Sequence, residues 1–231
     1  MCKMRCAIIM MMCLLSGCIT MQGSEATDTL TARYVFAELK APELELLSHS
    51  TRLDMLAYAD ENKSYDAPNE MRGTASLECL TSNFAKVKVS QVSEVQIMTL
   101  PYKKGGIAAV VYTVSSEGAD SELLMYDSAL HLLKTEKFFK APELKDFIAS
   151  EYRGNKEVVN LLSELIPFIA TRYEFDPQTF SLTATLTVKE IVSKEAYEKA
   201  LPYLTNKGES ATPRVLTYTW TGKKFIPEEK N

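Results

Sequence analysis

The sequence predicts an α+β fold, in which one or two antiparallel β-sheets pack against a few helices. The first observation is the apolar run Ile107–Val114, which is rich in β-branched side chains and follows two glycines. Such a run is typical of a strand that is buried on both faces. The second observation is that nearby segments alternate apolar and polar residues and are joined by short turns. Short connections favour antiparallel pairing, because a parallel crossover needs a dozen or more residues.

Strands are expected on both sides of the central run. Phe84–Val89 and Val95–Ile97 alternate as half-buried strands do, and Ser121–Asp127 follows after a turn. In the second half, the most regular alternation is at Phe180–Val188, where one face should pack on a core and the threonine face should meet solvent. Further strands are expected at His131–Phe139 and in a C-terminal hairpin, Val215–Trp220 with Lys223–Ile226.

Helices are expected where the pentapeptide Lys-Ala-Pro-Glu-Leu occurs, at residues 40–44 and again at residues 140–144. Proline suits the first helical turn, and an acid there is favourable. The predicted helices run to about Tyr58, with a break near Ser48–Ser50, and to about Ser150. Two more should start after the caps Asn155 and Ser193. The repeat fits either a tandem duplication or two convergent helix starts, and the second interpretation is favoured.

The first 17 residues resemble the signal peptide of a bacterial lipoprotein. Lys3 and Arg5 precede the apolar run Ala7–Leu15, which is too short to span a bilayer. The run ends in Leu-Ser-Gly-Cys, which resembles a lipobox, with cleavage before Cys18 and lipid attached to that residue. An ordinary signal peptide that contains cysteine is the alternative. Several acyl chains would anchor the protein stably.

The expected organisation is therefore a signal peptide (1–17), a flexible tether (18–33), a globular domain (34–226) and a short tail (227–231). The domain could consist of two halves, 34–139 and 140–226. No acidic run follows Cys18 directly, which favours the outer membrane with the protein facing the periplasm. Asp28-Thr29-Leu30 resembles a short O-glycosylation pattern, so Thr29 is a candidate acceptor. Cys79 would be left alone in the mature domain, and we expect it to be a small core residue.

Composition argues against nucleic acid as a partner. The formal net charge is −4, and the chain lacks a basic stripe. It becomes −6 when residues 1–17 leave, because Lys3 and Arg5 leave with them.

No motif for metal, cofactor or nucleophilic catalysis is present. His49 and His131 lie far apart, each without the spacing of a zinc site, and serine-nucleophile and phosphate-loop patterns are missing. We therefore expect no metal and no cofactor. Trp220 is expected to pack in the core or the hairpin, with a ligand platform as the alternative. Four acids cluster along the first helix and the following loop: Asp54, Asp60, Glu61 and Asp66. They are expected to form a solvated face, with an acid/base or calcium site as the alternative. Asp54 could instead pair with Arg52.

A spaced pattern of residues from about Phe36 to Phe225 resembles an uncharacterised domain-of-unknown-function family of secreted Bacteroidales proteins. The resemblance implies a lineage and a compartment, and it implies no activity. The matching residues are Arg52-Leu53-Asp54-Met55, Tyr58, Gly73, Leu80-Thr81, Leu100-Pro101, Val111-Tyr112-Thr113, Asp120-Ser121 and Tyr126.

These observations together predict a lipid-anchored envelope protein that binds or scaffolds a protein or glycan of the envelope. The alternative is an envelope hydrolase that uses the carboxylates of Asp54, Asp60, Glu61 and Asp66.

Overall fold

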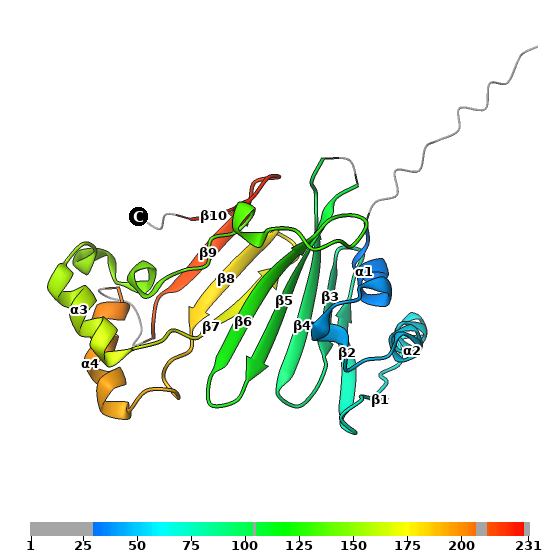
Figure 1. Ribbon diagram of the computed structural model, residues 1–231, viewed down its shortest axis with the longest axis horizontal. Coiled ribbons are helices and arrows are strands. Elements are labelled where there is room, and N and C mark those ends of the chain that lie inside the picture. The colour runs from blue at the N-terminus through cyan, green and yellow to red at the C-terminus, as the bar shows by residue number, and fades with distance from the viewer. Residues whose placement is uncertain (1–29, 104, 207–211, 229–231) are drawn as a thin grey trace, which may run out of the picture.

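The computed structural model describes residues 30–103, 105–206 and 212–228, and these residues form the predicted α+β fold. Figure 1 shows two antiparallel sheets beside one another, with helices at both ends of the molecule. The first sheet has six strands in the order β1-β2-β3-β4-β5-β6, and the second has four in the order β10-β9-β8-β7. Among the described helices, none has the length and apolar character needed to cross a membrane.

The strands of the first sheet follow one another as a meander: β1 (Ala67–Pro68), β2 (Thr74–Leu80), β3 (Phe84–Lys88), β4 (Ser93–Leu100), β5 (Ile107–Ser115) and β6 (Ala119–Tyr126). Those of the second sheet are β7 (Thr171–Asp176), β8 (Ser181–Leu186), β9 (Val215–Trp220) and β10 (Phe225–Pro227). The α-helices are α1 (Ala32–Glu38), α2 (His49–Asp60), α3 (Lys156–Leu165) and α4 (Lys194–Leu204). Four 3₁₀ turns are η1 (Pro42–Leu44), η2 (Thr135–Lys137), η3 (Leu144–Phe147) and η4 (Ser150–Tyr152).

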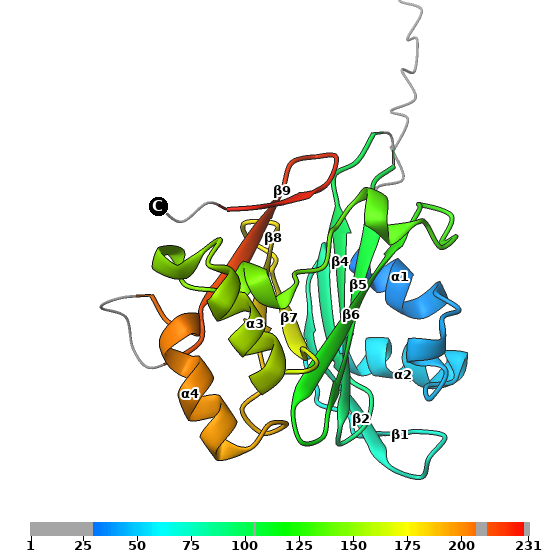
Figure 2. The ribbon, with the colours of Figure 1, turned by 60° about the vertical axis from the view of Figure 1, so that its left-hand side comes forward.

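Strand β5 lies inside the first sheet between β4 and β6, as the sequence predicts. Its residues are apolar without alternation because both faces of the sheet are covered. Ala108 and Val110 join the cluster formed with helices α1 and α2, while Ala109 and Val111 join the cluster formed with the second sheet and with α3 and α4. Figure 2 shows α1 and α2 on one side of the first sheet and the second sheet on the other.

The folded part of the chain includes residues 30–33, which the sequence analysis placed in the tether. Leu30 is buried, and its N–H bonds to Gly105 O at 3.4 Å. Thr31 caps α1 by accepting a hydrogen bond from the Tyr34 N–H. Helix α1 was not predicted from the sequence, because it is short and its burial depends on the sheet beneath it.

Neither Lys-Ala-Pro-Glu-Leu repeat begins an α-helix, so this prediction was wrong. Each leads into a 3₁₀ turn, η1 or η3. After the first repeat, the helix begins only at His49, because Ser48 supplies the cap through a bond from the Thr51 N–H. After the second, the consecutive residues Phe147, Ile148 and Ala149 are all buried. An α-helix cannot turn three successive side chains to one face, so the chain leaves the helical path there.

The structure also differs from the sequence-based prediction at two strands. His131–Phe139 was predicted to be a strand, yet it forms one bridge, between Leu132 and Tyr126, and then the turn η2. Both Phe138 and Phe139 are buried, which breaks the alternation of a strand. Strand β7 was missed, although its sequence Thr-Arg-Tyr-Glu-Phe-Asp alternates regularly.

The remaining elements of the second half agree with the sequence. Asn155 caps α3, Ser193 caps α4, and β9 and β10 form the terminal hairpin. Helix α4 continues past Pro202 to Leu204. In β8, Leu182 and Ala184 are fully buried while Thr183 is partly exposed.

Arg52 joins α2 to the end of α1 instead of pairing with Asp54. Its side chain is 6% exposed, and its Nη1 donates to Phe36 O at 2.9 Å and to Leu39 O at 2.8 Å. These carbonyls lie at the C-terminal end of α1, where a positive charge is favourable. Burial lowers the pKa of Arg52, and the nearby Glu38 carboxylate opposes this effect.

The two sheets meet where strand β7 places its free edge on the face of the first sheet. Gln96 on β4 is 2% exposed and acts as the bridge. Its side-chain carbonyl accepts from the Phe175 N–H at 3.0 Å, and its amide donates to Tyr173 O at 3.2 Å. Two side chains on β6 accept from the other outward N–H groups of β7. Asp120 accepts from the Thr171 N–H, and Ser121 accepts from the Tyr173 N–H.

Replacing Gln96 with Met should destabilise the protein by about 2–4 kcal/mol, because one buried N–H and one buried C=O lose their partners. Urea unfolding followed by circular dichroism measures this change. Gln178→Met, at an exposed position, is the matched control and should have little effect. Equal stability of the two variants would show that Gln96 does not hold the sheets together.

Replacing Arg52 with Met should cost about 3 kcal/mol, because two buried carbonyls at the end of α1 lose a charged donor. The same unfolding experiment tests it, with the exposed Arg153→Met as the control. An unfolding free energy unchanged from wild type would contradict this role.

Candidate functional site

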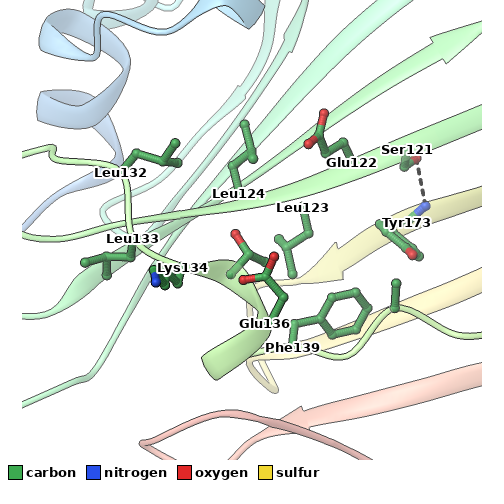
Figure 3. Close-up of a pocket in the computed structure, with 12 residues that line it drawn as sticks. Ser121, Glu122, Leu123, Leu124, Leu132, Leu133, Lys134, Glu136, Phe139 and Tyr173 are labelled. Atoms are coloured by element: carbon green, nitrogen blue, oxygen red, sulfur yellow. Dashed lines mark hydrogen bonds between the residues drawn. The ribbon is translucent and has the colours of Figure 1, made fainter.

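A pocket of about 450 Å³ lies along the outer edge of strand β6. We call it the β6-edge pocket. Its wall is mainly apolar, and Figure 3 shows that β6, the segment leading into η2 and strand β7 surround it. The large apolar and aromatic lining residues are Leu123, Leu124, Leu132, Leu133, Phe139 and Tyr173.

The alternation of β6 turns its side chains to two sides of this pocket. Leu123 is buried in the cluster between the two sheets, where Phe139 also packs. Leu124 lies on the opposite face, against the cluster of α1 and α2. The pocket therefore lies at the sheet edge where the two hydrophobic clusters approach each other. Leu132, another lining residue, is 62% exposed.

The edge of β6 is open at Leu123. On the side away from β5, Met125 O accepts from the Leu133 N–H at 2.7 Å, and Ala119 O accepts from the Thr187 hydroxyl. Because the backbone groups of alternate residues point the same way in a strand, the N–H and C=O of Leu123 also point away from β5. In the described part of the chain, neither group has a hydrogen-bond partner on that side. At Ser121 strand β7 lies against β6, because the Ser121 hydroxyl accepts from the Tyr173 N–H at 3.0 Å.

Charged groups stand around the mouth of the pocket. Glu122, Lys134 and Glu136 are exposed lining residues, and none of them takes part in an ion pair within the described ranges. Burial raises the pKa of Tyr173. The wall thus combines an apolar surface, one open backbone N–H and C=O pair, and a carboxylate on the strand itself.

This arrangement is suited to binding a ligand. Nucleophilic or acid/base catalysis requires a reactive group with a partner that activates it. The pocket contains no histidine or cysteine. In residues 30–103, 105–206 and 212–228, no group of three metal-ligating side chains comes together.

The four carboxylates of the hydrolase hypothesis do not line this pocket, and all four are exposed. Asp60 forms a bidentate ion pair with Arg33, at 2.6 and 2.7 Å, which lowers the pKa of Asp60. Glu61 pairs with Lys63 at 2.5 Å. This geometry agrees with the predicted solvated face and gives the hydrolase hypothesis no convergent site.

Other residues singled out by the sequence have structural roles or lie elsewhere. His49 and His131 are exposed, beside Glu38 and Asp127 respectively. Trp220 is 7% exposed and donates to Pro101 O at 2.9 Å, so it packs in the core.

Cys79 is exposed, so its predicted place in the core was wrong. A bulge between Leu77 and Cys79 changes the alternation of β2 at this point. Cys18 and Thr29 lie outside the described residues, and their modifications stay predictions.

Two smaller cavities are less suited to a ligand. One, of about 380 Å³, lies near η3 and β9, and its buried Arg214 already bonds to Ile148 O and Asp146 O. The other, of about 330 Å³, lies between α1 and α2 and includes the Arg33 and Asp60 pair.

The residues at Ser121–Asp127 predict the strand but do not predict the pocket. A pattern that identifies a strand does not show whether its edge is paired, and the lining residues form no motif.

The fold and the pocket define a two-sheet α+β protein with a ligand-sized cavity at a sheet edge. The chain belongs to the family described as protein of unknown function DUF3256, whose model matches residues 24–225. This confirms the resemblance that the sequence indicated. A similar solved structure is that of a domain of an uncharacterised protein from Porphyromonas gingivalis W83, a member of the Bacteroidales. Its TM-score is 0.70 at 21% identity, covering 84% of this chain and 98% of that chain, which shows a shared fold. The comparison with curated proteins gave no match.

Proposed function

We propose that this protein is a lipid-anchored binding module of the cell envelope, which holds an envelope component in the β6-edge pocket. The observation that carries the proposal is an apolar pocket whose wall includes an unpaired stretch of sheet edge. Apolar pockets with a few directed polar groups are typical ligand sites. The dispersed, exposed carboxylates favour binding over hydrolysis.

The anchor is the lipid on Cys18, and its support is the lipobox-like Leu-Ser-Gly-Cys sequence after an apolar run. In this proposal the protein stands on the periplasmic side of the outer membrane. A protein fixed at a membrane surface needs no transmembrane helix of its own, since several acyl chains give stable attachment.

Replacing Cys18 with Ala should abolish incorporation of a palmitate analogue and move the protein out of the membrane fraction, because the acceptor sulfur is lost. Cys13→Ala is the matched control, since that residue precedes the cleavage site and should leave labelling intact. Lipid label retained on the Cys18→Ala protein would refute the anchor.

A photo-cross-linking amino acid placed at Leu132 should capture the bound component in cells that produce the full chain, because Leu132 is exposed at the mouth of the pocket. Met71, which is 73% exposed in the loop between β1 and β2, is the control position. A specific adduct from position 132 and none from position 71 supports the proposal. The absence of such an adduct, or the same adduct from both, counts against the pocket as the binding site.

A further inference from the structure

We infer that the β6-edge pocket binds a short extended peptide segment, with an apolar residue opposite Leu123 and a basic residue opposite Glu122. This inference rests on the proposed function, because it names the ligand class of the same pocket. It follows from the backbone of β6, the alternation of its side chains and the charge at its mouth.

The backbone requires a ligand that can both donate and accept at one point. The N–H and C=O of Leu123 point out of the sheet together, and a single residue of an antiparallel partner strand satisfies both. A parallel partner would need two residues, one on each side of that position, since its hydrogen bonds are slanted. Every neighbouring pair in the first sheet is antiparallel, so an antiparallel segment also continues the order of the sheet. Extended peptides bind in this way to open sheet edges in other proteins.

The length of the opening limits the segment to a few residues. The Leu133 N–H pairs the Met125 carbonyl at one end of this opening, and at the other end strand β7 lies against Ser121, whose hydroxyl accepts from the Tyr173 N–H. Four residue steps separate these points, which is about 13 Å of extended chain. A tripeptide therefore fills the open edge, and longer ligands have to leave the pocket at both ends.

Side-chain alternation fixes what each of the three residues meets. Residues that face each other across a pair of strands point to the same side. The central residue is therefore directed with Leu123 toward Phe139 and Tyr173, which favours an apolar side chain. In an antiparallel segment, the preceding residue lies opposite Leu124 and the following residue lies opposite Glu122.

Charge complementarity selects the third residue. Glu122 is exposed and has no ion-pair partner among the described residues. Lys134 and Glu136 also line the pocket and carry opposite charges, and in the described part of the chain no ion pair joins either of them to Glu122. A Lys or Arg side chain opposite Glu122 therefore finds an uncompensated carboxylate, while an acidic one meets repulsion.

The test titrates acetyl-Leu-Leu-Lys-amide and acetyl-Leu-Leu-Glu-amide into the chain from residue 18 onward, kept unlipidated by Cys18→Ser. Nuclear magnetic resonance follows the backbone amides. The lysine peptide should shift the Leu123 amide and slow its hydrogen exchange, and it should bind about fivefold or more tightly than the glutamate peptide. The reversed peptide, acetyl-Lys-Leu-Leu-amide, should bind more weakly, because its basic residue would lie opposite Leu124.

Glu122→Lys should exchange the preference, so that the glutamate peptide becomes the tighter ligand. Asp54→Lys makes the same charge change at an exposed position on α2 and should leave the preference as in the wild type. A Leu123 amide that does not respond at millimolar peptide, or equal affinities for the two peptides, would overturn the inference. If neither peptide binds while the cross-linker at Leu132 captures a component in cells, the peptide class is wrong and the proposed function stands.

Discussion

The free edge of strand β7 is the constraint on which the arrangement of the two sheets depends. An edge strand that is buried must find partners for its outward N–H and C=O groups, since each unpaired group costs roughly 1–3 kcal/mol. Here the first sheet supplies them from side chains, with the Gln96 amide taking the place of a peptide group. This fixes where β7 stands on the first sheet, and with it the space left for the apolar residues of the shared core.

The β6-edge pocket follows from the same constraint. Tyr173 on β7 contacts one end of the β6 edge through the Ser121 hydroxyl, and the Leu133 N–H pairs the Met125 carbonyl at the other end. Between them, no described group bonds to the outward N–H and C=O of Leu123. The two edges of the first sheet therefore differ in how well they are protected against pairing with another strand. The opposite edge of the first sheet ends in the two-residue strand β1, which contains Pro68, a residue that discourages further pairing.

The local pattern of apolar, polar and capping residues predicted the elements whose structure depends mainly on residues near them in the sequence. The apolar run at β5, the alternation at β8 and the caps Asn155 and Ser193 were sufficient for this. The predictions failed where distant contacts decide the structure, as in the two pentapeptide repeats that form 3₁₀ turns. The pocket also depends on contacts between residues that are distant in sequence. Whether Leu123 is open depends on Tyr173, fifty residues away in sequence, so no motif around Ser121–Asp127 could have revealed it.

The bond between the Leu30 N–H and Gly105 O fixes where the chain enters the fold. The entry point in turn limits how far the pocket can lie from a lipid on Cys18. Gly105 also lies near Ser128, in the turn that follows β6, so the entry point is at one end of the strand that carries the pocket. Twelve residue steps separate Leu30 from Cys18, which is a contour of about 40 Å at full extension. A lipid on Cys18 would therefore restrict the pocket to a thin layer next to the bilayer, where the effective concentration of surface-bound ligands is high.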